Sequence, residues 1–179
     1  MKTLETERLI LRGWRLEDLD DLYEYAKSPD VGPNAGWTPH FSRDESLSAL
    51  RSFIEDDDRW AIVLKDNGKV IGAIRLYPDE NRGKFSEKKS ARLINYVLSP
   101  DFWGKGYMTE AVKRVIRYAL EETNTELLTA FHTPESIRSK RVIEKCGFEY
   151  EYTIEQGYQN YDGRLLDSVC YSILRRRDN

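Results

Sequence analysis

The sequence of 179 residues is poor in cysteine and histidine, with two of each. Cys146 and Cys170 lie in apolar contexts without metal-motif spacing, which indicates structural thiols in a reducing cytosol and argues against a disulfide framework. His40 and His132 are too few for a site built from several histidines. We therefore expect a cytoplasmic protein that holds no metal.

Long apolar runs and a charge excess are also missing. No run approaches the roughly 18 apolar residues that a membrane-spanning helix needs. The first ten residues, MKTLETERLI, carry early acids and lack the apolar stretch of a secretory signal. The formal net charge is -3, which provides no general attraction to nucleic acid or to anionic membranes. We expect neither as a partner.

The composition of the sequence is typical of one globular domain, which we expect to span residues 1–179. Hydrophobic residues make up 40% and charged residues 33%, with no repeat, low-complexity stretch or linker. A chain of this length buries about 70% of the surface that its unfolded form exposes, so it can fold without disulfides or metal.

The apolar periodicity predicts seven strands and four helices in an α+β arrangement with a largely antiparallel sheet. Asn67-Gly68 is a strong hairpin signal between two of these strands. The strands are expected at 9–11, 60–64, 70–76, 91–98, 127–131, 148–155 and 168–174. The helices are expected at 16–27, 44–54, 109–122 and 135–145, with Gly147 as a C-terminal cap.

A strand, a turn with Gly104 and Gly106, and an amphipathic helix follow one another directly. Backbone amides at a helix N-terminus have no partners within the helix, and the helix dipole adds positive charge there. Glycines let a phosphate approach that backbone closely, so the turn indicates a phosphate or pyrophosphate site. The alternative is a plain strand-to-helix turn in which glycines relieve strain. The pattern is neither a Walker A loop nor the dinucleotide fingerprint.

A second polar stretch follows in the helix expected at 135–145. Ser136, Ser139, Lys140 and Ile143 share one face by their spacing. Hydroxyls beside Lys140 could meet a thioester and a phosphate, and the alternative is a solvated helix face.

Together these two stretches resemble the GNAT superfamily of acetyl-CoA-dependent N-acetyltransferases, and most of all its RimJ/RimL-type branch of ribosomal-protein N-terminal acetyltransferases. The resemblance covers nearly the whole chain. Its motifs are Thr6-Glu7-Arg8-Leu9-Ile10-Leu11-Arg12, Val70-Ile71-Gly72, Trp103-Gly104-Lys105-Gly106-Tyr107-Met108-Thr109-Glu110-Ala111 and Glu144-Lys145-Cys146-Gly147-Phe148.

The resemblance implies a mixed, mostly antiparallel sheet of about seven strands with about four flanking helices, splayed beside strand 91–98. Acetyl-CoA would be the co-substrate, with its pantetheine arm in the splay. Ser136, Ser139 and Lys140 would face it from the second helix. The pantetheine would pair with the backbone of Tyr96, Val97 and Leu98, and the pyrophosphate would lie on the amides of Trp103, Gly104, Lys105, Gly106, Tyr107, Met108 and Thr109.

Two positions depart from the family pattern. The family usually has Asn at the position of Ser136, and it often has Glu, a base acting through water, at the position of Leu93. Ser139 matches the serine proposed in the RimL type to protonate the leaving thiolate. His132 and Tyr171 are candidate bases, although both residue types often serve only structure.

These residues leave three functions open. The first is an N-acetyltransferase of primary amines, whose acceptor is a protein N-terminus or a small molecule. The second is a CoA-binding sensor with weak or no catalysis, which Leu93 favours, and the third is a nucleotide-binding module. Acceptor recognition is expected from segments 28–41, 78–90 and 158–164, because such loops vary while a scaffold stays. The protein is expected to be a monomer or a homodimer.

Overall fold

The computed structural model describes residues 1–79 and 90–175. Within them, one sheet of eight strands has the order β1-β2-β3-β4-β5-β6-β8-β7. Neighbouring strands are antiparallel except β5 and β6, which are parallel. The strands are β1 (Leu4–Glu5), β2 (Leu9–Arg12), β3 (Arg59–Leu64), β4 (Val70–Pro78), β5 (Ala91–Leu98), β6 (Leu127–His132), β7 (Glu149–Gln159) and β8 (Leu165–Leu174).

Five α-helices and two short 3₁₀ helices accompany the sheet in the described ranges. The α-helices are α1 (Leu19–Ala26), α2 (Gly32–Ala35), α3 (Arg43–Asp56), α5 (Tyr107–Glu122) and α6 (Ile137–Lys145). The 3₁₀ helices are η1 (Leu16–Asp18) and η2 (Pro100–Phe102). The predicted fold class is confirmed, with one strand and one α-helix more than expected.

The two extra elements are too short to leave a periodic signal. β1 has two residues, and α2 has four in a segment expected to be a loop. Pro33 fits the first turn of α2, and Gly36 ends the helix in the left-handed conformation, with φ of +88°. The helix expected at 16–27 begins with η1, and β7 and β8 extend further toward their turn than predicted. Most of segment 78–90 lies outside the described residues.

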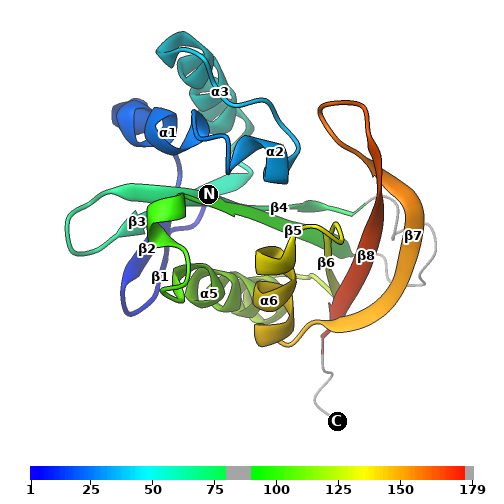
Figure 1. Cartoon of the computed structure of the whole chain (residues 1–179). Helices are drawn as coiled ribbons and strands as arrows, with labels where there is room; N and C mark the ends of the chain where they lie inside the picture. The colour runs from blue at the N-terminus through cyan, green and yellow to red at the C-terminus, as the bar shows by residue number, and fades with distance from the viewer. Residues whose placement is uncertain (80–89, 176–179) are drawn as a thin grey trace.

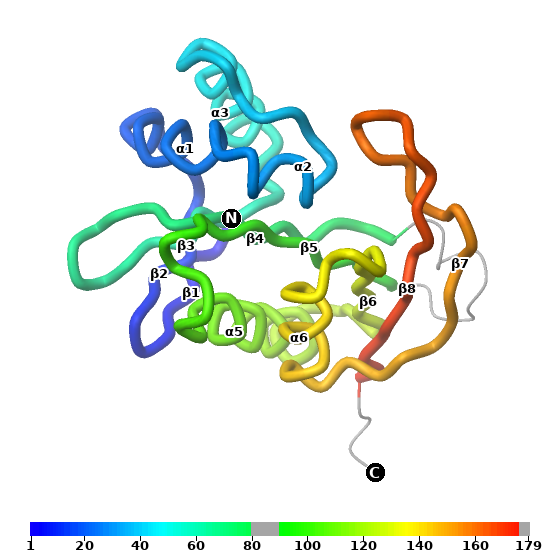
Figure 2. The backbone as a smooth tube through the Cα atoms, in the orientation of Figure 1, coloured from blue at the N-terminus to red at the C-terminus, as the bar shows by residue number. Residues whose placement is uncertain are grey.

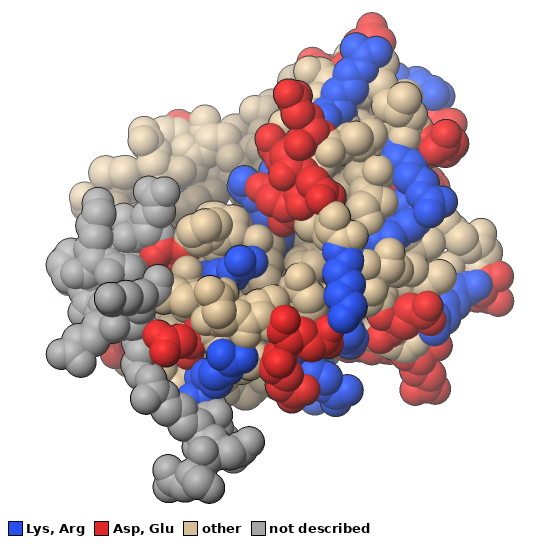
Figure 3. Space-filling view, turned by 180° about the vertical axis from the view of Figure 1, so that it is seen from behind, with Lys and Arg blue, Asp and Glu red and all other residues tan. Residues whose placement is uncertain are grey.

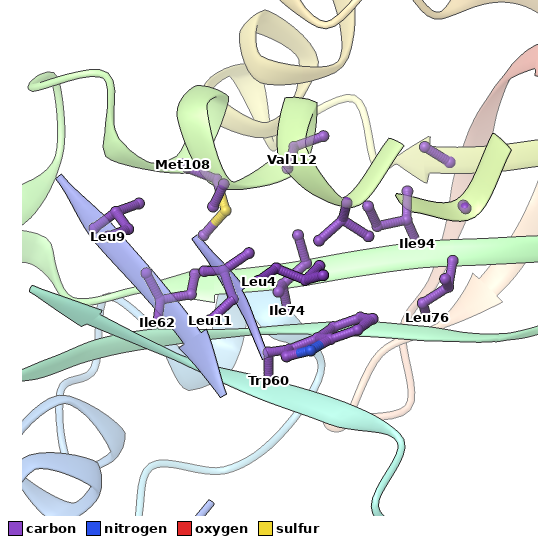
Figure 4. Packing of buried hydrophobic residues seen from close by; sticks show 14 of the residues in the cluster. Leu4, Leu9, Leu11, Trp60, Ile62, Ile74, Leu76, Ile94, Met108 and Val112 are labelled. Atoms are coloured by element: carbon purple, nitrogen blue, oxygen red, sulfur yellow. The ribbon is translucent and has the colours of Figure 1, made fainter. Parts of the chain in front are cut away.

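Helices cover both faces of the sheet (Figure 1): α1, α2 and α3 lie on one face, and α5 and α6 on the other. Each face has its own apolar cluster, as strand alternation requires. The larger cluster packs β1–β6 against α5, with Leu9, Ile62, Ile74 and Val112 fully buried (Figure 4). The smaller one packs Trp14, Leu22 and Leu50 against the opposite face.

The central strands part after a short stretch of pairing. β5 pairs with β6 only at Ala91, Arg92 and Leu93, where Leu93 lies opposite Thr129. Beyond this point β5 stays paired with β4 as far as Leu98, while β6 stays paired with β8 as far as His132. The splay implied by the resemblance is therefore present.

Gly72 lets β4 and β5 approach closely at the far end of the splay. It lies opposite Leu98 in the register, and a Cβ atom there would collide with the Val97 carbonyl oxygen and approach the Leu98 Cα within 3.1 Å. Both obstacles are backbone, so they can yield only if the strands shift. The backbone position of β5 therefore depends on this glycine.

We predict that Gly72→Ala lowers the free energy of unfolding by about 1–3 kcal/mol, as overpacking in a rigid site does. Gly13→Ala is the matched control, because a Cβ there meets only an Asp57 oxygen at 3.8 Å. Urea unfolding of both variants measures the difference. Equal stability of the two variants would contradict the close approach.

Candidate active site

The strand register decides which backbone groups of β5 face the opening. The Ser99 amide donates to the Ile71 carbonyl at 2.8 Å, and alternate residues of an antiparallel pair share such bonds. Val97 therefore directs its N–H and C=O toward Ala73, whereas Tyr96 and Leu98 direct theirs away from β4. The Leu98 carbonyl accepts a hydrogen bond from Trp103 Nε1 at 2.9 Å. Of the three predicted strand residues, Tyr96 has the backbone best placed for an extended ligand.

The glycine turn has the conformation of an anion site. Gly104 and Gly106 both have positive φ, at +75° and +81°, and Gly106 is the residue before α5. No side chain of the described residues caps this helix start, so the first amides of α5, from Tyr107 to Thr109, point outward. A Cβ at Gly106 would lie 3.5 Å from Arg8 Nη2, and any side chain there would have to adopt a positive φ.

A clamp that the sequence analysis did not assign holds the turn and the start of α5 to the segment just before β2. The Glu110 carboxylate accepts hydrogen bonds from Thr6 Oγ1 at 2.6 Å, from the Arg8 amide at 2.9 Å and from Arg8 Nε at 2.7 Å. Arg8 Nη1 also donates to the Lys105 carbonyl at 3.0 Å, and its guanidinium lies 4.2 Å from the Tyr107 ring centre.

Burial acts to raise the pKa of Glu110, but the hydrogen bonds from Thr6 and Arg8 outweigh it and lower the pKa below its usual value. Glu110 therefore stays ionised and keeps its hold on Arg8. The sequence signal for this clamp was present, because the N-terminal motif contains Thr6 and Arg8 and the turn motif contains Glu110. Their spacing of about 100 residues conceals the contact.

The start of α6 faces the opening from the other side. Ser139 lies with its hydroxyl 3.2 Å from the Tyr96 hydroxyl, and Ser136 Oγ lies 3.1 Å from Thr133 Oγ1. Lys140 is exposed and its Nζ is 3.8 Å from Glu144. Arg138, which the sequence analysis did not select, stacks over the Trp103 ring at 4.0 Å and so brings a cation to the glycine turn.

His132 and Tyr171 form a second buried pair, separate from the contact between Ser139 and Tyr96. His132 Nδ1 lies 2.8 Å from the Thr133 carbonyl, which can only accept, so Nδ1 carries the hydrogen. Nε2 then accepts from the Tyr171 hydroxyl at 3.2 Å. Burial raises the pKa of Tyr171. Both ring nitrogens of His132 are therefore in hydrogen bonds, and its role as a base stays a prediction.

A cavity of about 500 Å³ that is open to solvent lies beside the point where β5 and β6 part. Arg75, Tyr77 and Leu93 line it. The residues next to them along each strand pack in the larger core cluster beneath α5, and side chains alternate between the two faces of a strand. The three lining side chains therefore lie on the face of the sheet opposite α5. Asp79 also lines it and accepts from Thr129 Oγ1 at 2.5 Å. Leu93 thus forms a cavity wall, next to a carboxylate from the end of β4.

Two of the segments expected to recognise an acceptor meet on this face. Tyr158 of β7 stacks on Phe131 with ring centres 5.7 Å apart, and its hydroxyl fills the space that a Cβ at Gly36 would take. The β7–β8 hairpin accordingly stands up beside α2 (Figure 2). Trp37 packs on His40, and burial lowers the pKa of that histidine.

The surface charge is mixed. Acidic and basic side chains lie among one another over the face opposite to that of Figure 1 (Figure 3). Among residues 1–79 and 90–175, no group of three or more His, Cys, Asp or Glu side chains is arranged to hold a metal ion. None of the helices in those ranges is both long and apolar enough to cross a membrane.

Comparison with known proteins decides the family. The profile of the acetyltransferase (GNAT) domain matches residues 8–149. This chain belongs to the GNAT acetyltransferase family. It is 30% identical to the uncharacterized N-acetyltransferase p20 of Bacillus licheniformis, over 98% of both chains. It is also 32% identical to the FsC-acetyl coenzyme A-N(2)-transacetylase of Aspergillus fumigatus, over 97% of this chain and 76% of that protein.

Solved structures of this GNAT family have the same fold. A GNAT acetyltransferase from Bacillus anthracis superposes with a TM-score of 0.85, covering 97% of this chain and 99% of that one at 21% identity. The ribosomal-protein-S5-alanine acetyltransferase from Vibrio fischeri gives 0.77, covering 98% and 97% at 19% identity. The expected enzyme class, an N-acetyltransferase, is confirmed by the family match and by the named relatives.

We predict that Gly106→Val weakens CoA binding about 30-fold, equivalent to about 2 kcal/mol, because the side chain crowds the phosphate-facing backbone. Gly68→Val is the matched control. Gly68 also has positive φ, at +74°, but lies in the β3–β4 turn with nothing within 4 Å of its Cβ position. Calorimetry measures both affinities. Equal CoA affinity in the two variants would show that the turn does not hold the cofactor.

Proposed function

We propose that this protein transfers the acetyl group of acetyl-CoA to a primary amine by direct attack within a ternary complex. The observation that carries the proposal is the parting of β5 and β6 beside the glycine turn, in a chain of the GNAT family. The opening offers unpaired strand backbone at Tyr96, and the turn offers helix-start amides, as a pantetheine and a pyrophosphate require.

The cofactor would lie along one side of the sheet opening. Its pantetheine would pair with the backbone of Tyr96 and Leu98, and its pyrophosphate would occupy the amides from Trp103 to Thr109. Ser136, Ser139 and Lys140 would border it from α6, and Arg138 adds a cation over Trp103. The name of the Aspergillus relative supports acetyl coenzyme A as the donor.

The reaction is mainly a matter of positioning. The amine nitrogen attacks the thioester carbonyl, the new C–N bond forms, and the C–S bond breaks as the tetrahedral intermediate collapses. One proton leaves the amine and one is gained by the departing thiolate. We propose Ser139 as the donor to that sulfur, because it lies on the α6 face that borders the opening.

The amine would approach through the cavity on the opposite face. A volume of about 500 Å³ suits a small ligand or the end of a peptide. The names of the relatives include both classes, an N(2) amine and the alanine of ribosomal protein S5. Tyr158, Trp37 and the segment around α2 would contact the rest of the acceptor.

Because position 93 is leucine, no glutamate at that position can accept the proton of the amine. The routes open to it are the pair formed by His132 and Tyr171, Asp79 through water, and bulk solvent. An α-amino group has a pKa of about 8 and a lysine ammonium about 10.4, so most of either acceptor is protonated at pH 7. The enzyme must then draw on the small neutral fraction.

We predict that kcat/KM for acetyl transfer rises with pH up to the acceptor's own pKa, and that the midpoint moves when amines of different pKa are compared. Leu93→Glu should raise the rate at pH 7, and Leu93→Gln, which lacks the carboxylate, should not. A panel of amines and N-terminal peptides with acetyl-CoA gives the measurement.

Two results would contradict this proposal. CoA binding without turnover of any amine would indicate a sensor. A midpoint at pH 6 to 7 that ignores the acceptor's pKa would indicate an enzyme base, and its loss in Asp79→Asn would identify that base.

A further inference from the structure

The Tyr96 side chain makes a double contact with Ser139 that none of the steps above uses. Its hydroxyl lies 3.1 Å from the Ser139 carbonyl oxygen and 3.2 Å from Ser139 Oγ. We propose that Tyr96 is a positioning residue, which fixes the Ser139 hydroxyl so that its hydrogen is directed at the departing sulfur. This inference rests on the proposed acetyl transfer.

The fold explains why a strand tyrosine reaches α6. Along β5 the side chains of Tyr96 and Val97 go to opposite faces, and Tyr96 packs with the cluster beneath α5 and α6. Because β6 has diverged from β5 at this level, the Tyr96 ring can lie against the first turn of α6. The one residue would thus contribute its backbone to pantetheine and its hydroxyl to Ser139.

There are two arrangements in which the two hydroxyls are hydrogen-bonded to each other. The carbonyl oxygen of Ser139 only accepts, and a tyrosine hydroxyl has one hydrogen to donate. Either Tyr96 donates to the carbonyl while Ser139 donates to Tyr96, or Tyr96 donates to Ser139 Oγ and leaves the serine hydrogen free. Only the second arrangement presents a donor to the opening.

The negative charge that develops on the departing sulfur favours the second arrangement. A hydrogen bond to an ionised acceptor is about twice as strong as a neutral one, so the developing thiolate draws the Ser139 hydrogen toward it. Tyr96 then turns its own hydrogen to Ser139 Oγ and stabilises that orientation. Burial raises the pKa of Tyr96 strongly, although its bond to Ser139 acts in the opposite direction. The phenol therefore keeps its proton and has a hydrogen to donate to Ser139 Oγ.

Without Tyr96 the serine has a competing partner. A hydroxyl within a helix commonly turns back to a carbonyl of the preceding turn, and for Ser139 this is the carbonyl of Ser136, which begins α6 and accepts from the Lys140 amide at 3.1 Å. Such a rotation would take the hydrogen away from the opening. The expected cost is a lower rate of thioester cleavage with little change in cofactor binding.

The test is a double-mutant cycle of Tyr96→Phe and Ser139→Ala, with kcat for acetyl transfer and the Kd of CoA measured for each protein. Ser139→Ala should lower kcat by about 10- to 1000-fold. Tyr96→Phe should lower it about 10-fold with the Kd within twofold, and should lower it no further in the Ser139→Ala background. Tyr118→Phe is the control, since this tyrosine lies edge-on to Trp60 in the same core.

Equal rate losses from Tyr96→Phe in both backgrounds, or an unchanged kcat, would overturn the positioning role and leave the proposed function standing. No acetyl transfer by the wild-type protein to any amine would overturn both. If Tyr96→Phe unfolds at the assay temperature, 3-fluorotyrosine at position 96 replaces it as a more acidic hydroxyl of similar size. It should change kcat when Ser139 is present and not in Ser139→Ala, and the same change in both would reject the role.

Discussion

The loss of pairing between β5 and β6 after Leu93 and Thr129 is the feature on which the rest of the site depends. A parallel pair that continued to the strand ends would satisfy the backbone of Tyr96 and leave no space beneath α6. Because the strands part, one edge of β5 lacks a strand partner while its other edge is held by β4. The opening is thus rigid on one side and available on the other.

Several contacts keep the walls of this opening in place. The clamp of Glu110 by Thr6 and Arg8 ties the glycine turn to the segment just before β2, and Trp103 holds the Leu98 carbonyl at the end of β5. From α6, Arg138 stacks on Trp103 and Ser139 meets Tyr96. The N-terminal motif therefore supports the glycine turn although it lies about 100 residues away in sequence.

The sequence allowed the element order, the fold class and the family to be predicted, because these depend on local periodicity and on short motifs. Gly147 caps α6 with φ of +84°, as its place after a polar helix indicated. The pairings of Tyr96 with Ser139 and of His132 with Tyr171 could not be predicted. They depend on how far two strands diverge and on the strand register. Neither property can be inferred from the spacing of residues along the chain.

The same limit applies to the acceptor side. Leu93 was recognised as a departure from the family pattern, but its neighbour Asp79 was not, because the end of β4 approaches Thr129 only in the folded sheet. Likewise, the contact of Tyr158 with Gly36 joins two segments that were expected to recognise an acceptor separately. Sequence reasoning therefore assigns catalytic residues least well where the side chains that contact one another come from different strands.

The central claim is that a cofactor pairs with the free edge of β5, and amide hydrogen exchange along this strand tests it most directly. The register predicts that saturating CoA slows exchange of the Tyr96 amide, which faces the opening. It predicts much less effect on the Val97 amide, which is already paired with Ala73. Resolved by NMR, selective protection of Tyr96 would agree with the account. No protection at Tyr96, or equal protection at Tyr96 and Val97, would contradict it.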